Sequence, residues 1–224
     1  MKLGTAAIAV ILLAIALLAG CTKNATDADQ IVGSSRIVSQ QRPASAFSGI
    51  QLTGVGRVVI TQDTVESLRV EANDNIIDKV TTSVHHGLLM IELQQGSYSN
   101  ITLNLFVSMK DIGSLACVGA GEFLNSGQIH ADTLRCSISG AGKMTLTGTA
   151  TRETVIVSGA GDVHNFGLTS TYCVATISGA GNVEVNVLQQ LDATINGTGN
   201  IAYSGNPQVI NQAVSGIGSI HPGN

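Results

Sequence analysis

Tryptophan is absent from this chain, and aromatic residues of all kinds make up only 3% of its 224 residues. Ligand-binding clefts and carbohydrate-binding platforms usually depend on aromatic side chains, so their scarcity argues against a sugar-binding module. Charged residues are also few, at 12%, and the formal net charge is −4. Because no basic patch and no alternation of basic with aromatic residues occurs, we expect no nucleic-acid partner.

A short apolar run opens the chain. Residues 1–20 carry a single charge, at Lys2, and the four residues ending at Cys21 read Leu-Ala-Gly-Cys. The run is slightly short for a membrane span, which makes a transmembrane anchor the weaker alternative. Its ending is similar to the lipobox of bacterial lipoproteins, whose cleavage exposes a cysteine for lipidation. We therefore predict a signal peptide over residues 1–20 and a lipid on Cys21 that anchors the protein to a membrane.

The segment that follows the cysteine predicts where the protein is attached. Residues 21–36 are polar and lack hydrophobic periodicity, so we interpret them as the lipidated N-terminus and a tether. Thr22 follows the cysteine, at a position where many inner-membrane lipoproteins of Gram-negative bacteria carry Asp. We therefore expect a lipid anchor in the bacterial outer membrane, with the domain facing the periplasm or the cell surface.

Six Gly-x-Gly triplets recur in the second half of the chain. Their first glycines are 21, 19, 20, 18 and 19 residues apart, and a fixed period near twenty is typical of a solenoid. A seventh triplet begins at Gly54. The first glycines of the six repeats are Gly119, Gly140, Gly159, Gly179, Gly197 and Gly216.

Apolar residues alternate with polar ones before each triplet, which predicts a strand with one buried face. The position two before the glycine holds Cys117, Ile138, Val157, Ile177, Ile195 and Val214. The position four before holds Leu115, Cys136, Val155, Ala175 and Ala193, with Gln212 as an exception. The position six before holds Leu134, Cys173, Leu191 and Ile210, with Glu153 as an exception. The position four after holds Phe123, Met144, Val163, Val183, Ile201 and Ile220, so a second strand follows each triplet.

These columns predict an all-β fold, a parallel β-helix with coils of about 20 residues and right-handed connections. Glycine suits the corner of each coil because it tolerates positive φ and close backbone approach. We expect the middle residue of each triplet, usually Ala, to fill the narrow interior angle. The β-helix domain spans residues 37–224. Within it, residues 113–224 form the regular repeats, and residues 37–112 either continue the coils or form a less regular N-terminal part.

Three cysteines lie within this domain. Cys117 and Cys136 fall on neighbouring coils but are offset by two residues, and Cys173 lies two coils beyond Cys136. These separations exceed the Cα distance that a disulfide spans. We therefore expect three buried free thiols.

Polar residues form a further column, three positions after the first glycine of each triplet. Such side chains stack on one outward edge, and the first three alternate in sign about 5 Å apart. A solvated ladder that keeps the coils in register is the simple interpretation. An interaction or ligand-binding strip is the alternative. The column contains Glu122, Lys143, Asp162, Asn182, Asn200 and Ser219.

No catalytic, cofactor or metal site is expected. His164 and Glu184 share a column, with His221 two coils further on, but a His–Glu pair lacks a third and fourth metal ligand. His85 and His86 precede Gly87 in an expected hairpin turn, where adjacent side chains point in opposite directions. Hydroxyl side chains before the glycines have no histidine spaced to activate them. They are Ser139, Ser158, Ser178 and Ser215, with Asn196 at the equivalent place.

The carboxylates also argue against polysaccharide hydrolysis, which needs clustered acids on one face. We expect those at the following positions to lie in different columns: Asp111, Asp132, Asp162 and Asp192.

Several motifs together resemble one bacterial family, the putative auto-transporter adhesin head domain, also called the GIN domain. They are Phe47-Ser48-Gly49-Ile50, Gly54-Val55-Gly56-Arg57-Val58, the segment from Val65 to Ala72, the segment from His86 to Ile91, and the serial Ser-Gly-Ala-Gly units. The resemblance covers nearly the whole mature chain. It implies an all-β, helix-like lipoprotein or secreted domain of bacterial envelopes, with no enzymatic residues to transfer.

We therefore predict a non-catalytic envelope module for adhesion or structural interaction. Its partner is the membrane through the lipid, together with a second copy, an envelope protein or a glycan. Adhesion through the polar face and self-association through the last coil, where residues 218–224 include no covering helix, are competing mechanisms. A polysaccharide-binding or polysaccharide-degrading β-helix protein is the alternative function.

Overall fold

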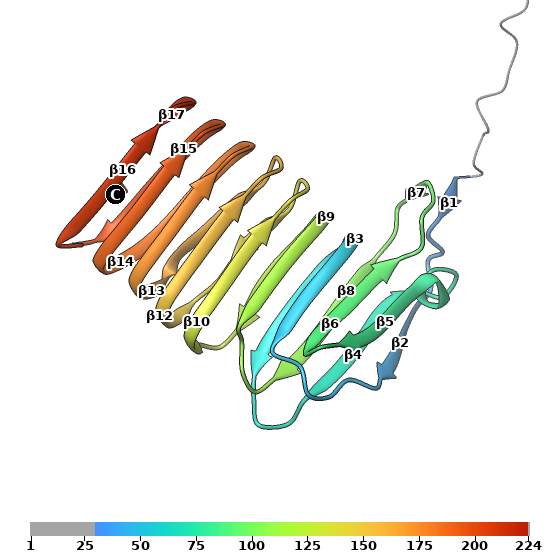
Figure 1. The fold of residues 1–224 in the computed structure, drawn as a ribbon. Helices are drawn as coiled ribbons and strands as arrows, with labels where there is room; N and C mark the ends of the chain where they lie inside the picture. Colours follow the sequence, from blue (N-terminus) through green and yellow to red (C-terminus); the bar gives the residue numbers. More distant parts are fainter. Residues whose placement is uncertain (1–29, 224) are drawn as a thin grey trace, which may run out of the picture.

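The computed structural model describes residues 30–223, which form β-strands and one turn of 3-10 helix at Ile77–Lys79 (Figure 1). The predicted signal peptide and Cys21 lie outside these residues. In the part that is described, no helix has the length and apolarity needed to cross a membrane.

Parallel strands build the C-terminal half of a fifteen-stranded sheet. In β12 (Gly148–Val157), Val157 pairs with Ile138 of β10 (Ile129–Ile138) and with Ile177 of β13 (Asp162–Ile177). Ile138 lies 19 positions before Val157 and Ile177 lies 20 positions after it, which matches the spacing of the glycine triplets. Each strand thus lies beside its equivalent in the next repeat, as the row in Figure 1 shows. The other parallel strands are β9 (Ser114–Ser126), β11 (Lys143–Thr145), β14 (Ala180–Ile195), β15 (Thr198–Gly205), β16 (Val209–Val214) and β17 (Ile217–Pro222).

The N-terminal part has mixed pairing. Strand β3 (Gly49–Gln62) joins the repeats, because it pairs in parallel with β9 and aligns Gly54 with Gly119. On its other side the pairing becomes antiparallel, from β8 (Leu103–Met109) to β4 (Ser67–Asn73) and on to β2 (Ile37–Arg42). A regular parallel repeat therefore does not extend through all of this part. The remaining strands are β1 (Ile31–Val32), β5 (Val80–His85), β6 (Leu88–Leu93) and β7 (Tyr98–Ser99).

The hairpin turn expected at His85 and His86 is confirmed. Strands β5 and β6 pair antiparallel up to His85 and Leu88, and the two residues between them have φ of 50° at His86 and 78° at Gly87. Two consecutive positive φ values match the twist of a two-residue hairpin, and glycine adopts such a value without a steric cost.

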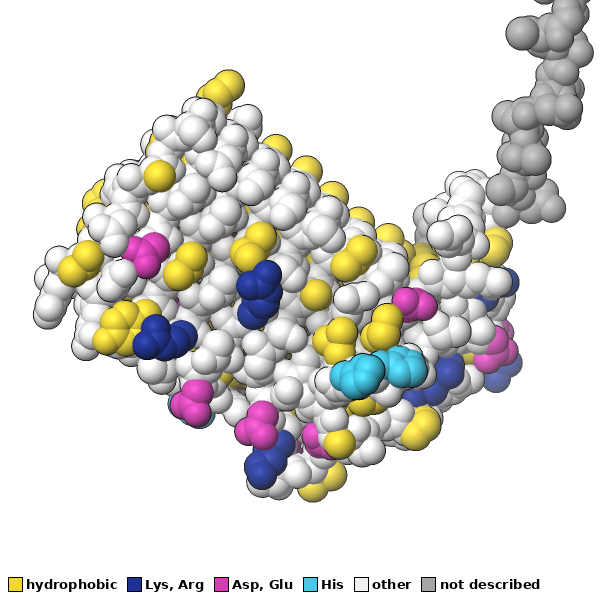
Figure 2. Space-filling model, viewed as in Figure 1, with side chains coloured by type: hydrophobic (Ala, Val, Ile, Leu, Met, Phe, Trp, Pro, Cys, Tyr) yellow, Lys and Arg dark blue, Asp and Glu magenta, His cyan; other side chains and the backbone are white. Residues whose placement is uncertain are grey.

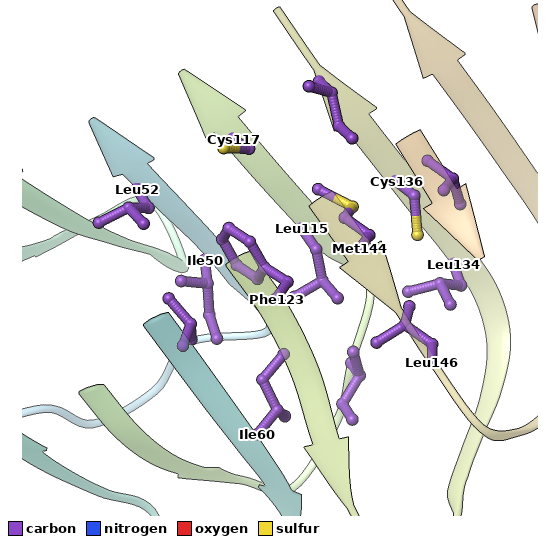
Figure 3. Close-up of a cluster of buried hydrophobic side chains, with 14 of the residues drawn as sticks. Ile50, Leu52, Ile60, Leu115, Cys117, Phe123, Leu134, Cys136, Met144 and Leu146 are labelled. Atoms are coloured by element: carbon purple, nitrogen blue, oxygen red, sulfur yellow. The ribbon is translucent and has the colours of Figure 1, made fainter. Parts of the chain in front are cut away.

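The core lies where the alternating columns predicted it. Figure 3 shows Leu115, Phe123, Met144 and Leu146 close together in the interior, and each has no exposed surface. Full burial of such a side chain contributes about 1.5–3 kcal/mol. The prediction is wrong for Ile210 and Val214, which are 37% and 48% exposed. Both lie on β16, which pairs only with β14 among the described strands, so no following strand covers them.

The triplets correct the expectation about their middle residues, which are exposed rather than turned into the interior. Ala141 and Ala160 lie on the surface, whereas the adjacent Gly142 and Gly161 are buried. The reason is space, because a Cβ on Gly161 would lie 2.5 Å from the carbonyl oxygen of Gly142. Positive φ is needed in only some repeats, for example at Gly199 with φ of 148°. Close stacking of glycine backbones explains the other repeats.

The three cysteines of the described chain are free and buried, as predicted. Cys136 pairs with Leu115, and Cys117 pairs with Ile138, which is the expected offset of two residues. Burial raises the pKa of the Cys136 and Cys173 thiols well above the usual range. These thiols therefore behave as small apolar side chains rather than nucleophiles.

Candidate functional site

The structure brings the six predicted polar residues into one column that crosses the strands. Lys143 pairs with Glu122 on one side and with Asp162 on the other. Asn200 continues the column, because it pairs with Asn182 and with Ser219. The sequence repeat placed these residues in register because each follows its glycine triplet by the same number of positions.

Two more residues belong to this column and were missed in the sequence. Arg57 pairs with Glu122, and the Arg57 Nε atom lies 3.2 Å from Glu122 Oε2. Asn104 pairs with Arg57 from the opposite side. Arg57 could have been found, because it follows Gly54 by three positions like the other members. Asn104 could not, because β8 carries no triplet. We call the eight residues together the polar column.

The two halves of the polar column differ in chemistry. At the C-terminal end, amide side chains link the strands, with Asn182 Nδ2 donating to Asp162 Oδ1 at 3.2 Å and Asn200 Nδ2 donating to Asn182 Oδ1 at 3.3 Å. The Ser219 hydroxyl donates to Asn200 Oδ1 at 2.9 Å. This half holds its neighbours in register, which is the simple interpretation of the ladder.

The N-terminal half alternates in charge, from Arg57 through Glu122 and Lys143 to Asp162. Lys143 makes no ion pair within residues 30–223. The exposed pair of Arg57 and Glu122 contributes at most about 1 kcal/mol to stability. On the face shown in Figure 2, uncharged side chains and backbone cover most of the surface, and charged side chains are few. Four charged residues in adjacent register are thus a local concentration of charge.

A groove of about 600 Å³ runs beside these four charged residues. The small triplet residues Ala120, Ala141 and Ala160 line it, together with Ile101 and Leu103 from the segment before and at the start of β8. We call it the ladder groove. Its lining residues include no His, Cys or Ser. An extended partner with alternating charges could bind here through ion pairs.

The other candidates from the sequence stay separate from the ladder groove. His164 Nδ1 lies 2.8 Å from Glu184 Oε2, and both side chains are 34% exposed. His221 pairs with Ala202 one strand beyond Glu184. Within residues 30–223, no three His, Cys, Asp or Glu residues are grouped so that they could hold a metal ion.

A buried polar cluster escaped the sequence analysis. Glu153 is 1% exposed, and its Oε1 accepts a hydrogen bond of 2.7 Å from Asn165 Nδ2. Its Oε2 is buried without a partner in the described chain. Burial raises the Glu153 pKa to about 7, although the hydrogen bond from Asn165 acts in the opposite direction. The sequence did contain a sign of this cluster, because Glu153 is the one charged residue in a column of otherwise apolar residues. We take the cluster as a structural feature, because it is enclosed in the core.

Comparisons with known proteins support an adhesin-like family. The family model described as "Putative auto-transporter adhesin, head GIN domain" matches residues 46–207. No curated protein matched the chain. A solved structure from Bacteroides fragilis, titled a putative adhesin, has a TM-score of 0.70 at 20% identity, over 86% of this chain and 99% of its own.

Two structures from Parabacteroides distasonis are also similar. One, titled a putative lipid binding protein, has a TM-score of 0.52 at 23% identity, over 88% of this chain and 100% of its own. The other, titled a putative adhesin, has a TM-score of 0.53 at 20% identity, over 87% and 100%. At these identities the structures establish the fold alone. The family match spans more than half of the chain and agrees with the motifs in its sequence, so the chain belongs to the putative auto-transporter adhesin head, GIN domain, family.

Proposed function

We propose that this protein is a non-catalytic adhesion module of the bacterial cell envelope, and that the ladder groove is its contact surface. The observation that carries the proposal is the alternating row of Arg57, Glu122, Lys143 and Asp162 beside a groove of about 600 Å³. A row of fixed charges on a rigid sheet favours a partner of complementary charge pattern and disfavours others. The adhesin description of the family supports this function.

The scaffold of this module is, in our proposal, a right-handed parallel β-solenoid. Its support is the parallel pairing of each strand with the strand one repeat later. Parallel crossovers are right-handed in nearly all proteins. An experimental electron-density map would test the handedness, and left-handed coils would contradict it.

We expect the Cys21→Ser variant to move from the membrane fraction to the soluble fraction. The predicted diacyl anchor on Cys21 holds a protein stably on a bilayer, whereas residues 22–30 contain no apolar run to replace it. Fractionation of expressing cells, with the mass of the mature N-terminal peptide, measures this. Unchanged membrane attachment of a variant from which residues 1–20 have been cleaved, or a wild-type Cys21 peptide without acyl chains, would contradict the lipid anchor.

Removing two charges of the ladder groove should abolish adhesion. Cells that express the full chain are compared under shear flow on three surfaces: a lawn of the same cells, a mucin layer and a fibronectin layer. On at least one surface we expect Glu122→Ala/Lys143→Ala to reduce retention to the level of cells without the protein.

The matched control for this experiment is Arg135→Ala/Glu92→Ala. It also removes one cation and one anion from exposed positions, and neither side chain has a bonded partner in residues 30–223. Equal retention of the two double variants, or no retention of wild-type cells on any surface, would exclude the ladder groove as the contact surface.

Self-association at the last strands is a second mechanism within the same function. Val209, Val214 and Ile217 are 46%, 48% and 75% exposed there, and the outer edges of β16 and β17 are unpaired among the described strands. Retention on the lawn of the same cells that is lost in Ile217→Lys, and kept in Glu122→Ala/Lys143→Ala, would favour this mechanism.

A further inference from the structure

A second groove, of about 570 Å³, crosses β10, β12 and β13 and shares no lining residue with the ladder groove. Threonine is its commonest lining residue, and it occurs on three successive strands. We call it the threonine groove. The threonines that line it are Thr133, Thr149, Thr151, Thr169 and Thr171.

The threonine groove forms where the strand ladder is interrupted at the same place on successive strands. Between β10 and β12, pairing runs from Ala131 with Ala150 directly to Thr133 with Arg152, so that Thr151 is bypassed. The pairing of β12 with β13 bypasses Thr171 in the same way. Thr149, Ala150 and Thr151 all line the groove, and Ala150 lies at its floor because it is only 5% exposed. The strand is therefore concave toward solvent at this point.

Hydroxyl groups on this concave surface form a grid. Thr149 pairs with Thr169 on the next strand, at the spacing of about 4.8 Å between neighbouring strands. Along one strand, Thr149 and Thr151 are two residues apart, or about 6.6 Å. The grid thus repeats hydrogen-bonding groups in two directions, at intervals comparable to the size of one sugar unit. A rigid strand scaffold holds them there without a loop that must be ordered on binding.

Several polar groups of the groove remain free to bind a ligand. The Thr149 hydroxyl lies 2.9 Å from His130 Nδ1, and the Thr169 hydroxyl accepts from Asn186 at 3.3 Å. By contrast, the hydroxyls of Thr133, Thr151 and Thr171 have no side-chain partner within residues 30–223. The carboxylates of two further lining residues, Asp111 and Asp132, also make no hydrogen bond or ion pair in that range.

The charge of the lining selects the class of ligand. Asp111 and Asp132 are the charged side chains of the lining if His130 is neutral, and no Lys or Arg contributes to it. The nearest arginine along β12, Arg152, lies over the Tyr172 ring at 4.9 Å. Such a lining repels polyanions and attracts amines. Leu188, which is 51% exposed at the groove, offers an apolar contact for the C–H face of a sugar ring.

From these observations we propose that the threonine groove binds an extended amino-sugar glycan, with its hydroxyls on the threonine grid and its amines at Asp111 and Asp132. No aromatic side chain lines the groove, so binding depends on hydrogen bonds and charge rather than on ring stacking. Affinity per sugar unit is therefore low and grows with glycan length. The proposal rests on the threonine groove and is independent of the ladder groove.

Titration calorimetry of the purified full chain with three tetrasaccharides tests this site. The probes are β-1,4-linked glucosamine, its N-acetylated form and galacturonic acid, which are cationic, neutral and anionic. We expect glucosamine to bind most tightly and galacturonic acid not to bind. Thr151→Val/Thr171→Val should weaken glucosamine binding about tenfold, because the isosteric change removes two hydrogen-bonding hydroxyls. Asp132→Asn should reduce the preference for glucosamine over its N-acetylated form.

The matched control for the threonine variant is Thr176→Val/Thr194→Val. These two threonines also pair on neighbouring strands, β13 and β14, but neither lines the groove. We expect the control to bind like the wild type. Tighter binding of galacturonic acid than of glucosamine, no glucosamine binding by the wild type, or equal affinity in the two double variants would overturn the proposal. Adhesion under shear remains a separate result, because its variants alter the ladder groove alone.

Discussion

Replacing Gly159 by alanine is expected to lower the melting temperature by about 6–12 °C. An alanine Cβ at this position would lie 2.1 Å from the carbonyl oxygen of Gly140 and 2.7 Å from the carbonyl carbon and oxygen of Ser139. All three contacts are with backbone, so no flexible side chain can move to relieve them. Overpacking of this kind costs about 3 kcal/mol, and each kcal/mol shifts the melting temperature of a chain of this size by about 2–4 °C.

The cost is high because the same carbonyl oxygen carries the ladder across the corner. The Ala160 amide donates to Gly140 O at 2.8 Å, and one repeat later the Ala180 amide donates to Gly159 O at 2.8 Å. A methyl group that pushes Gly140 away lengthens the first of these bonds. Loss of this backbone hydrogen bond adds to the cost of the clash itself.

Ala160→Thr is the matched control, one residue away. Ala160 is exposed, and threonine already occupies the equivalent place in the triplet of Gly197, Thr198 and Gly199. We expect a change within about 0.5 kcal/mol, as for other surface substitutions. Thermal unfolding followed by circular dichroism measures both variants. If the Gly159→Ala protein melted within about 2 °C of the wild type, the stacking of the backbones would not require these glycines.

The repeated part of the fold could be predicted because every repeat buries the same strand positions and pairs with its neighbours in the same register. Alternation of residues such as Val155 and Val157 fixes which side chains face inward, and the constant spacing fixes which strands pair. The polar column follows from the same register. The register does not determine the backbone conformation at a corner, so the outward direction of Ala160 was not predicted. It depends on the absence of space for a Cβ at the neighbouring glycines.

Each of the two grooves also combines features that the sequence predicts with features that it does not. Arg57 could be placed from its triplet, but the ladder groove also needs β8, which enters through mixed pairing. The expectation that Asp111 and Asp132 occupy different columns is wrong, because each lies eight positions before the first glycine of its triplet, and both line the threonine groove. The register alone could therefore have grouped these two carboxylates. The interruption of the pairing between Asp132 and Thr151, at which the groove lies, is not predicted by a two-residue alternation. Contacts within one sheet were thus accessible from sequence, and contacts across a corner were not.

The buried cluster at Glu153 is a second contact across a corner, between β12 and the middle of β13. Glu153 pairs with Leu134 and Cys173 in its column, so the strand keeps its register and turns a carboxyl group into the core. Asn165 meets it there, donating to Glu153 Oε1 and accepting at 3.1 Å from the Leu146 amide. The neighbouring titratable groups that face Glu153 are the thiols of Cys136 and Cys173.

This cluster makes stability depend on pH, with a sign that follows from the raised pKa. Below pH 4.5 Glu153 is protonated in both the folded and unfolded states. As pH rises toward 7, the unfolded chain loses this proton while the folded chain keeps it, so deprotonation favours unfolding. The free energy of unfolding should therefore fall by about 3 kcal/mol between pH 4.5 and 7 and then level off.

Glu153→Gln should remove this dependence and raise the free energy of unfolding at pH 8 by about 1–3 kcal/mol. Glutamine keeps the oxygen that accepts from Asn165 but carries no proton to lose, so it takes the place of the neutral acid at every pH. Urea unfolding at pH 5 and pH 8 measures the change, with Glu92→Gln as the control because Glu92 is an exposed carboxylate of β6. The control should keep the wild-type dependence. An equally steep fall in stability in Glu153→Gln would assign the pH dependence to other groups and would mean that Glu153 is already ionised in the folded core.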